Sequence, residues 1–315
     1  MINKFRNWAL QATGRSYWHL PLPMSVGFRA EDLSLYFIDN TEKTNWKGAI
    51  DGNGIPLLAV DEGLIAFPTT VFQKTLGHWN LMNGQVTCGE IKGSIYEYHR
   101  SQFLVGANWA EQKLETGGGW KLPIGPSAYS AMTQGQGVSV LVRAHHLTGE
   151  IRYLEAALSA FRLFGVDENS GGVVGRVHGR PFLQEFPGST NVAVLNGAIF
   201  ALFGIYDLYI KTANLSHFET FKTHLASISC ALPCYDIGYW SRYDLSGNIA
   251  SPFYHNLHIA QLRALAVVDE SGPFDRMEKK FSKYGRNPIF LGLAIGLKIR
   301  QKFFLKDPEH GPQRA

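Results

Sequence analysis

Cysteine is scarce in this sequence. The 315 residues include three cysteines, Cys88, Cys230 and Cys234, which are too few for a disulfide framework. Cys230 and Cys234 are spaced for one helix face, but no second pair of ligands accompanies them, so we expect no metal site. Nothing else in the sequence predicts a cofactor. This cysteine usage favours a reducing compartment and therefore a cytoplasmic location.

Long hydrophobic runs are also missing. The longest, Pro288 to Leu297, is well short of the ~20 residues that a membrane-spanning helix needs. The first twenty residues mix Lys4, Arg6 and Arg15 with scattered aromatic residues and have no continuous apolar core, unlike a secretory signal. The sequence therefore predicts a protein that is soluble or peripheral at the inner face of a membrane.

Charge is low, at 18% of residues, while 45% are hydrophobic. This balance argues against disorder and supplies enough apolar residues for a large core. Length alone allows one large domain or two small ones. The 33 glycines argue against a coiled coil.

The positive charge is unevenly distributed. Removing eight basic residues near the end of the chain from the total of 30 leaves 22 basic against 26 acidic residues. The eight are Lys279, Lys280, Lys283, Arg286, Lys298, Arg300, Lys302 and Lys306, and no acidic residue lies among them. We expect 287–315 to form a basic amphipathic helix and tail, which contacts an anionic membrane through 287–306 or is an ordinary solvated face.

The first 68 residues predict an N-terminal segment of mixed structure that wraps the rest. Residues 33–39 alternate enough for a strand, and 51–56 read as a turn followed by an extended piece. Helical periodicity begins at Thr69, with amphipathic stretches at 69–83 and 94–111. The fold class that we predict is therefore mainly α.

Two polar motifs follow these helices. In the Gly-Gly-Trp loop at 117–123, Trp120 is a candidate for stacking on a sugar, or else an anchor for the loop. Tyr129-Ser-Ala-Met-Thr-Gln-Gly-Gln136 then opens a helix that continues to His145. Because an amide both donates and accepts, Gln134 and Gln136 suit hydroxyl recognition, or they satisfy backbone groups at the helix end.

A glycine-rich hairpin is predicted at 171–186. Arg176, His178 and Arg180 occupy alternating positions, so they would share one face of a strand and bind an anionic sugar, or form a basic solvent-facing surface. Glu185 follows, just before a helix that we expect to start near Asn191. From Val192 to Leu208 that helix is apolar on nearly every side, interrupted mainly by Asn196 and two glycines, and is predicted to be buried all round.

Two further motifs carry aromatic and titratable side chains. Tyr235-Asp-Ile-Gly-Tyr-Trp-Ser-Arg-Tyr-Asp-Leu245 predicts a short β element that includes Arg242 and Tyr243. Tyr254-His-Asn-Leu-His-Ile-Ala-Gln-Leu-Arg263 predicts a helix with Tyr254 and His258 on one face. His255 and His258 are structural in one interpretation and site residues in the other.

Four of these stretches, 129–136, 195–208, 235–245 and 254–263, resemble in their order the C-terminal domain of the D-glucuronyl C5-epimerase family, of a short bacterial type. The resemblance covers about 70–285. It implies an incomplete α/α toroid, a barrel of helical hairpins with short β-hairpins, and we expect this domain to span 69–286 between segments 1–68 and 287–315.

The resemblance also implies an activity: an isomerase that inverts C5 of D-glucuronate to L-iduronate within an anionic polysaccharide, by removing a proton from one face and returning one to the other. It implies that Glu185 and Tyr254 flank C5, with Tyr243 as a further hydroxyl. Substrate binding is expected from Arg176, His178, Arg180, Gln134, Gln136, Trp120, Asn196, Arg242, His255 and His258.

Several questions stay open from the sequence. Phe186 stands where animal members of the family carry tyrosine after the glutamate, which puts the substrate and part of the proton relay in doubt. A polysaccharide lyase and a non-catalytic module of a capsule or lipopolysaccharide assembly system are the alternatives. We expect no nucleic-acid partner, and the oligomeric state, a homodimer included, is open.

Overall fold

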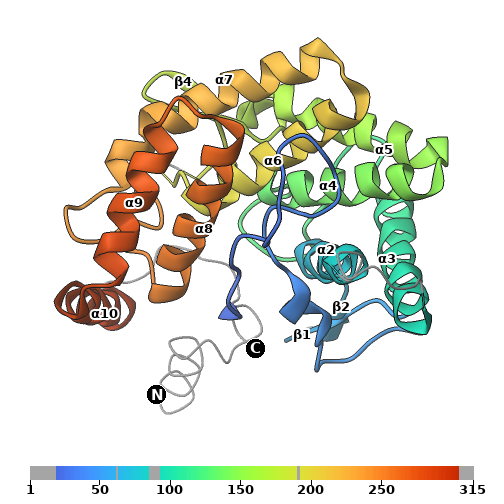
Figure 1. The fold of residues 1–315 in the computed structure, drawn as a ribbon, viewed down its shortest axis with the longest axis horizontal. Helices are drawn as coiled ribbons and strands as arrows, with labels where there is room; N and C mark the ends of the chain where they lie inside the picture. Colours follow the sequence, from blue (N-terminus) through green and yellow to red (C-terminus); the bar gives the residue numbers. More distant parts are fainter. Residues whose placement is uncertain (1–18, 62, 85–92, 190–191, 305–315) are drawn as a thin grey trace.

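The computed structural model describes residues 19–61, 63–84, 93–189 and 192–304, and within them the protein is mainly helical (Figure 1). The helices are α2 (Pro68–Gly84), α3 (Ser94–Gln112), α4 (Ala131–Thr148), α5 (Ile151–Phe161), α6 (Leu195–Thr212), α7 (Leu215–Ala231), α8 (Pro252–Val268), α9 (Pro273–Gly285) and α10 (Pro288–Phe304). The strands are β1 (Leu58–Val60), β2 (Gly63–Ile65), β3 (Val174–Val177) and β4 (Arg180–Leu183). Each helix predicted from periodicity is present.

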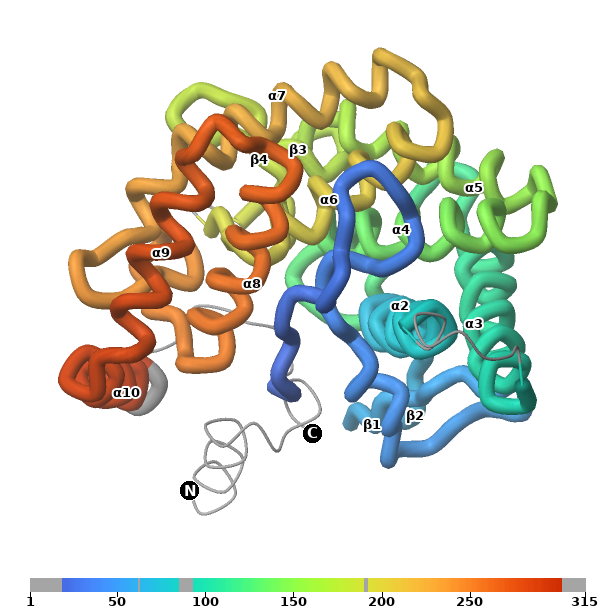
Figure 2. The backbone as a smooth tube through the Cα atoms, in the orientation of Figure 1, coloured from blue at the N-terminus to red at the C-terminus, as the bar shows by residue number. Residues whose placement is uncertain are grey.

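Consecutive helices pack in pairs along the chain. α2 packs on α3, α4 on α5, α6 on α7 and α8 on α9, while α2, α4, α6 and α8 also contact one another in sequence order. In Figure 2 the pairs follow one another as an arch, with α2 and α3 on one side and α8 to α10 on the other. The first helix of each pair therefore lies on the inner side of the arrangement.

The centre of the arch is a close crossing of α4 and α6. A Cβ atom at Gly135 would lie 2.4 Å from Cα of Ala201, and one at Gly204 would lie 2.4 Å from the carbonyl oxygen of Gly135. Only glycine allows the two backbones to approach this closely. From Leu195 to Ile205 every residue of α6 is buried, as its apolar sequence predicts.

The start of α6 differs from the prediction. The expected start near Asn191 lies outside the described residues, but α6 begins only at Leu195. Val194 forms an antiparallel bridge with Asp244, and the Leu195 N–H donates to the carbonyl of Tyr243. This pairing holds Val194 extended, so the apolar sequence before Leu195 is used as a bridge to the segment that carries Tyr243 rather than as the start of the helix.

The strand predicted at 33–39 does not form. In this region one isolated bridge joins Met24 to Ile38. The Asn80 side chain of α2 accepts from the Tyr36 N–H and donates to the Ile38 carbonyl, so a side chain replaces the neighbouring strand. The segment instead inserts Phe37 against Phe203 of α6, with stacked rings 3.7 Å apart.

Within the described ranges, the β-strands form two antiparallel hairpins, β1–β2 and β3–β4. The hairpin predicted at 171–186 is confirmed, with Val177 opposite Arg180. In the stretch 235–245, isolated bridges join Asp236 to Ser241 and Arg242 to Ile249 in place of a longer strand. Across the part of the chain that the structure describes, no helix has both the length and the apolar character needed to cross a membrane.

Candidate active site

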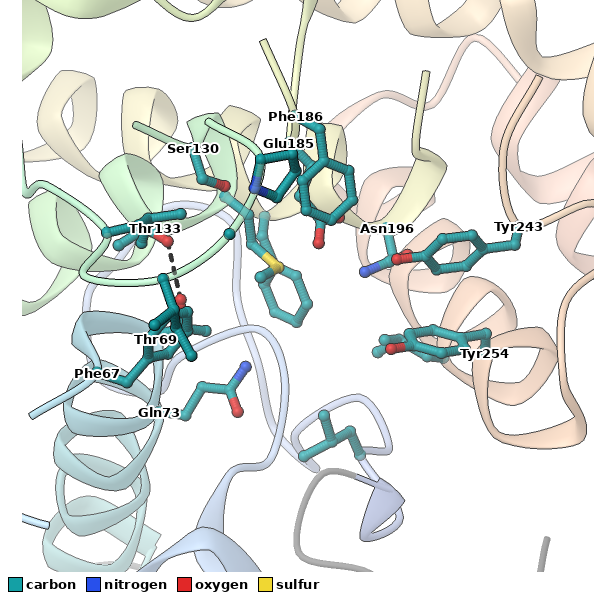
Figure 3. A pocket seen from close by; sticks show the side chains of 18 of the residues that line it. Phe67, Thr69, Gln73, Ser130, Thr133, Glu185, Phe186, Asn196, Tyr243 and Tyr254 are labelled. Carbon is teal, nitrogen blue, oxygen red and sulfur yellow. Dashed lines mark hydrogen bonds between the residues drawn. The ribbon is translucent and has the colours of Figure 1, made fainter. Parts of the chain in front are cut away.

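A cleft opens on the inner side of the arch, lined by the first turns of α2, α4, α6 and α8 and by nearby loops (Figure 3). It measures about 1100 Å³, the open solvent at its mouth included. Its walls are largely apolar, and the polar side chains among them are Thr69, Gln73, Ser130, Thr133, Glu185, Asn196, Tyr243 and Tyr254.

Glu185 enters the cleft from the chain that follows β4. The Gln184 carbonyl before it accepts from the first N–H of α4 at Ala131, which fixes this chain against the helix. The carboxyl packs on Gly197 of α6, where a Cβ atom would lie 2.4 Å from Glu185 Oε2. Glu185 is only 7% exposed, and this burial, together with the nearby charge of Asp244, raises its pKa to about 8.

Tyr243 and Tyr254 enter from another side of the cleft (Figure 3). Their ring centroids are 4.6 Å apart with the planes at 59°. Tyr243 is buried, and that burial, followed by the charges of Glu185, Tyr254 and Asp244, raises its pKa well above the ordinary value. Tyr254 lies in the first turn of α8, where the Ser251 hydroxyl caps its N–H. The three residues that the resemblance singles out therefore share one cleft.

Asp244 was not predicted as a site residue, although it stands in one of the motifs. It is fully buried, and its carboxylate accepts hydrogen bonds from the backbone and side chains of Ser246 and Asn248. The turn that it organises fixes Tyr243 against the start of α6. The Asp-Leu-Ser-Gly-Asn sequence of this turn is a signal that would have pointed to Asp244.

Asn196 and Phe186, both considered from the sequence, line the cleft. Asn196 is 3% exposed, and its Oδ1 has no hydrogen-bond partner among the described residues. Phe186 lies beside Glu185 in Figure 3, so its ring faces the cleft. Both side chains are placed to contact a bound molecule.

Gln134, Gln136 and Trp120 do not line the cleft. Gln134 accepts from the Trp120 N–H and donates to the carbonyls of Gly118 and Ala160, so it secures the loop before α4. Trp120 is 1% exposed and its indole N–H donates to the Ala110 carbonyl. These positions match the loop-anchor alternative, because the indole has no open face for a sugar. Gln136 is fully buried.

His255 and His258 lie behind the cleft wall rather than on it. Both rings contact the Ser241 hydroxyl through Nδ1, and His255 also stacks on Trp240 and bonds the Phe281 carbonyl. Burial lowers the pKa of His255 to about 4 and that of His258 to about 3. The two rings are therefore neutral at pH 7, and their location matches the structural alternative. Arg242 is half-buried and does not line the cleft.

The hairpin side chains Arg176, His178 and Arg180 are exposed and also lie off the cleft wall. His178 and Gly179 form the two-residue turn, both with positive φ, so the strand alternation ends at Val177. The Arg176 guanidinium donates to the Gly179 carbonyl across that turn. A basic solvent-facing hairpin describes this arrangement.

Four polar residues of the opposite wall were not predicted. Thr69 and Gln73 come from the first turns of α2, and Ser130 and Thr133 from the start of α4. The Thr69 and Thr133 hydroxyls are 2.8 Å apart and join the two helices (Figure 3). Ser130 and Thr133 belong to the same motif as Gln134. The motif therefore does contribute to the cleft, but through these two residues and not through Gln134 and Gln136.

The described cleft lining contains no lysine, arginine or histidine. Among the described residues, no three or more His, Cys, Asp or Glu side chains are arranged to hold a metal ion. The chemistry available from these side chains is therefore that of a carboxyl group, phenols, hydroxyls and amides. Such groups transfer protons and bind a polar molecule by hydrogen bonds.

Comparison with known proteins gives a family match over 110–283, described as D-glucuronyl C5-epimerase C-terminus. A D-glucuronyl C5-epimerase of Caenorhabditis elegans is 28% identical over 231 residues, which are 64% of this chain and 38% of that protein. An uncharacterized protein of Methanocaldococcus jannaschii is 34% identical over 160 residues, 50% of this chain and 51% of that protein. The chain thus spans about half the length or less of these relatives.

Proposed function

The chain belongs to the family of D-glucuronyl C5-epimerase C-terminal domains, and from this premise we propose that it inverts C5 of D-glucuronate residues in a polysaccharide, giving L-iduronate. The observation that carries the proposal is the meeting of Glu185, Tyr243 and Tyr254 in one cleft. The three side chains come from segments that are far apart in the sequence. Glu185 follows the β3–β4 hairpin, Tyr243 lies in the 235–245 segment and Tyr254 lies in α8. Binding alone would require neither a buried carboxyl group nor two facing phenols.

The proposed reaction moves one proton off C5 and one proton onto it. The C5–H bond is weakly acidic because it is adjacent to the carboxylate, and breaking it gives an enolate-like intermediate. A base removes the proton from one face, and an acid returns one from the opposite face, so no atom is gained or lost. Glu185 and Tyr254 fill these two roles in the proposal, with Tyr243 supporting.

The electrostatics of the cleft suit such an exchange. The charge of ionised Glu185 is one cause of the raised pKa of Tyr243, so ionisation of one group opposes ionisation of the other. The active form therefore has one negative charge shared between the carboxyl and the phenols. Whichever group holds that charge is the base, and the protonated group opposite is the acid.

We also propose that the helical pairs form an incomplete α/α toroid. The support is the pairing of α2 with α3, α4 with α5, α6 with α7 and α8 with α9, together with the contacts among the four first helices. A toroid places one end of every inner helix at a common centre. The cytoplasmic location, based on cysteine usage, stays a prediction.

The test is deuterium exchange at C5. We expect the purified protein, incubated in heavy water with candidate uronate polymers, to introduce deuterium at C5 of both epimers, read by NMR. Glu185→Gln and Tyr254→Phe should each lower the rate roughly 10²–10⁴-fold, the usual effect of removing a proton-transfer group. Both variants keep the side-chain volume, so their melting temperatures should stay close to that of the parent protein.

Two results would replace the proposal. Release of unsaturated oligosaccharides that absorb ultraviolet light would identify a polysaccharide lyase, since elimination also begins with removal of the C5 proton. Polymer binding without deuterium exchange on any uronate would identify a binding module.

A further inference from the structure

The cleft is ringed by the amino-terminal turns of four long helices. Thr69 of α2, Thr133 of α4, Asn196 of α6 and Tyr254 of α8 are each the second or third residue of their helix. The first turn of a helix presents N–H groups without partners inside the helix and carries roughly half a positive charge. The helix ends thus contribute partial positive charge from backbone groups to a described lining that contains no cationic side chain.

The four helix ends are not equivalent. α8 is capped by its own Ser251, and the start of α6 is covered by the Glu185 carboxyl packed on Gly197. α2 begins with Pro68, which has no N–H to offer. α4 is different, because Ser130 at its N-cap position makes no capping hydrogen bond. At the start of α4 the N-cap side chain is therefore left to meet a ligand.

A second observation points to the same place. The Ser130 side chain is 2% exposed, and its Oγ has no hydrogen-bond partner among the described residues. Figure 3 shows this oxygen on the side of Ser130 that faces the cleft. A buried hydroxyl without a partner is costly to stability, and such groups in native proteins usually meet a ligand or water.

The first turn of α4 is also next to the proposed chemistry. Its first N–H, from Ala131, donates to the carbonyl of Gln184 at 2.9 Å, directly before Glu185. An anion bound at this turn would therefore lie beside the Glu185 carboxyl. In a uronate the carboxylate is bonded to C5. The site that binds the carboxylate and the Glu185 carboxyl that acts on C5 must therefore be neighbours.

We propose that the first turn of α4 binds the substrate carboxylate, through the Ser130 hydroxyl and the N–H groups of Met132 and Thr133. The identity of the anion as a uronate rests on the proposed function. Oriented N–H groups at a helix start also stabilise the negative charge that develops when the C5 proton leaves. This subsite would bind the carboxylate that Arg176, His178 and Arg180 were expected to bind from the sequence, and those three residues do not line the cleft.

The experiment compares one charged ligand with its neutral counterpart. The probes are an oligosaccharide of alternating glucuronate and N-acetylglucosamine and the same oligosaccharide after reduction of its carboxylates to hydroxymethyl groups, with dissociation constants from calorimetry. Since hydrogen bonds to charged groups are the stronger ones, we expect the wild type to bind the charged form roughly tenfold or more tightly. Equal binding of the two forms, or binding of neither, would overturn the subsite.

Variants locate the preference at α4. Ser130→Ala should weaken binding of the charged oligosaccharide roughly tenfold, the effect of one hydrogen bond to a charged group, and change binding of the reduced form less than about twofold. Ser130→Thr keeps a hydroxyl and should restore most of the preference. Ser139→Ala is the matched control, because Ser139 is buried on the same helix away from the cleft lining. A Ser130→Ala variant with the wild-type preference would refute the assignment.

Binding and catalysis separate the two proposals. The charged ligand could be preferred through Ser130 while no deuterium exchanges at C5. That result would support the subsite and contradict the epimerase activity. Exchange at C5 with no effect of Ser130→Ala on charged-ligand binding would leave the epimerase standing and remove the subsite. The wild-type comparison requires no variant, so it holds even if a substitution impairs folding.

Discussion

At the scale of single residues, the titration of Glu185 has a direct consequence for activity. Its pKa of about 8 means that the carboxyl is mostly protonated at pH 7. The active form lacks one proton, so we expect the rate constant kcat/KM for C5 exchange to rise about tenfold per pH unit up to about pH 8 and then level. Initial exchange rates between pH 6 and 9 test this expectation.

The same pH profile should hold for both directions of the reaction. The form with charge on Glu185 and the form with charge on a tyrosine contain the same number of protons, and the equilibrium between the two sugars does not depend on pH. Exchange measured from each epimer should therefore follow one curve. A flat profile from pH 6 to 9 would contradict the buried, protonated carboxyl.

Phe186 supports a second prediction at this scale. It lies in the cleft beside Glu185, where a hydroxyl added to the ring would face bound substrate. We expect Phe186→Tyr to fold, with a melting temperature close to that of the parent, and to change the ratio of rates between two uronate polymers. Phe182→Tyr is a suitable contrast because Phe182 is fully buried. Loss of folding in Phe186→Tyr would show that Phe186 is a packed core residue.

The sequence predicted the reactive residues of the candidate site better than it predicted which neighbouring side chains line the cleft. The resemblance pointed to Glu185, Tyr243 and Tyr254, and all three line the cleft. The motifs do not tell which neighbours turn inward: Tyr254 lines the cleft from the first turn of α8, while His258 lies one turn deeper and is buried. Ser130 and Asp244 were passed over for the same reason.

At the scale of elements, the close crossing of α4 and α6 carries a prediction. Gly204→Ala should destabilise the protein by about 1–3 kcal/mol, the typical effect of overpacking, because the added Cβ meets the backbone of Gly135 rather than a movable side chain. Gly296→Ala on α10 is the control, since nothing lies within 4 Å of its added Cβ. Urea denaturation of both variants measures the difference.

The control variant Gly296→Ala should not lower the free energy of unfolding. Alanine is a better helix former than glycine by about 1 kcal/mol in a helix interior, so Gly296→Ala is expected to be neutral or stabilising. If both variants lost the same free energy of unfolding, close packing at Gly204 would not be the cause. The close approach at this crossing also places the first turns of α4 and α6 on the two sides of Glu185.

Helices were predictable from periodicity because each buries one side or all sides over several turns. The absence of the strand expected at 33–39 was not predictable, because the backbone there bonds to the Asn80 side chain, and no local pattern reveals a partner 42 to 44 residues away. The hairpin was predicted correctly, but its positively charged residues were aligned through a turn that breaks the alternation at His178. Local sequence thus predicted elements, while long-range contacts decided their ends.

At the scale of the whole molecule, α10 lies at the edge of the arch (Figure 1) and exposes an apolar stripe. Ile289, Leu293 and Leu297 recur every fourth residue and are 70%, 51% and 36% exposed. Arg300, three helical turns after Ile289, is exposed on the same face. Another face of α10 packs on the protein, where Ala294 is buried and Gln301 bonds the Ile249 N–H and the Gly247 carbonyl.

We predict that this stripe binds an anionic lipid surface. No acidic residue occurs between Lys279 and Lys306, so an anionic surface would meet no repulsion from this segment. Each basic residue near an anionic leaflet contributes ~1 kcal/mol, and burial of the apolar side chains adds to it. Because Gln301 also bonds the loop that follows Tyr243, attachment would position the cleft close to the membrane.

Vesicle co-sedimentation tests the stripe with a matched pair of variants. Leu293→Asp should weaken binding to vesicles of phosphatidylcholine with 30% phosphatidylserine by roughly tenfold or more, since it replaces an apolar group that the lipid would bury with a charge that the lipid repels. Leu215→Asp is the control, because Leu215 is 69% exposed on α7, away from the stripe. Binding of the wild type should fall with added salt and be weak on pure phosphatidylcholine. Equal sedimentation of the two variants, or a concentration-dependent dimer that only Leu293→Asp abolishes, would assign the stripe to ordinary packing or to a second copy of the chain instead.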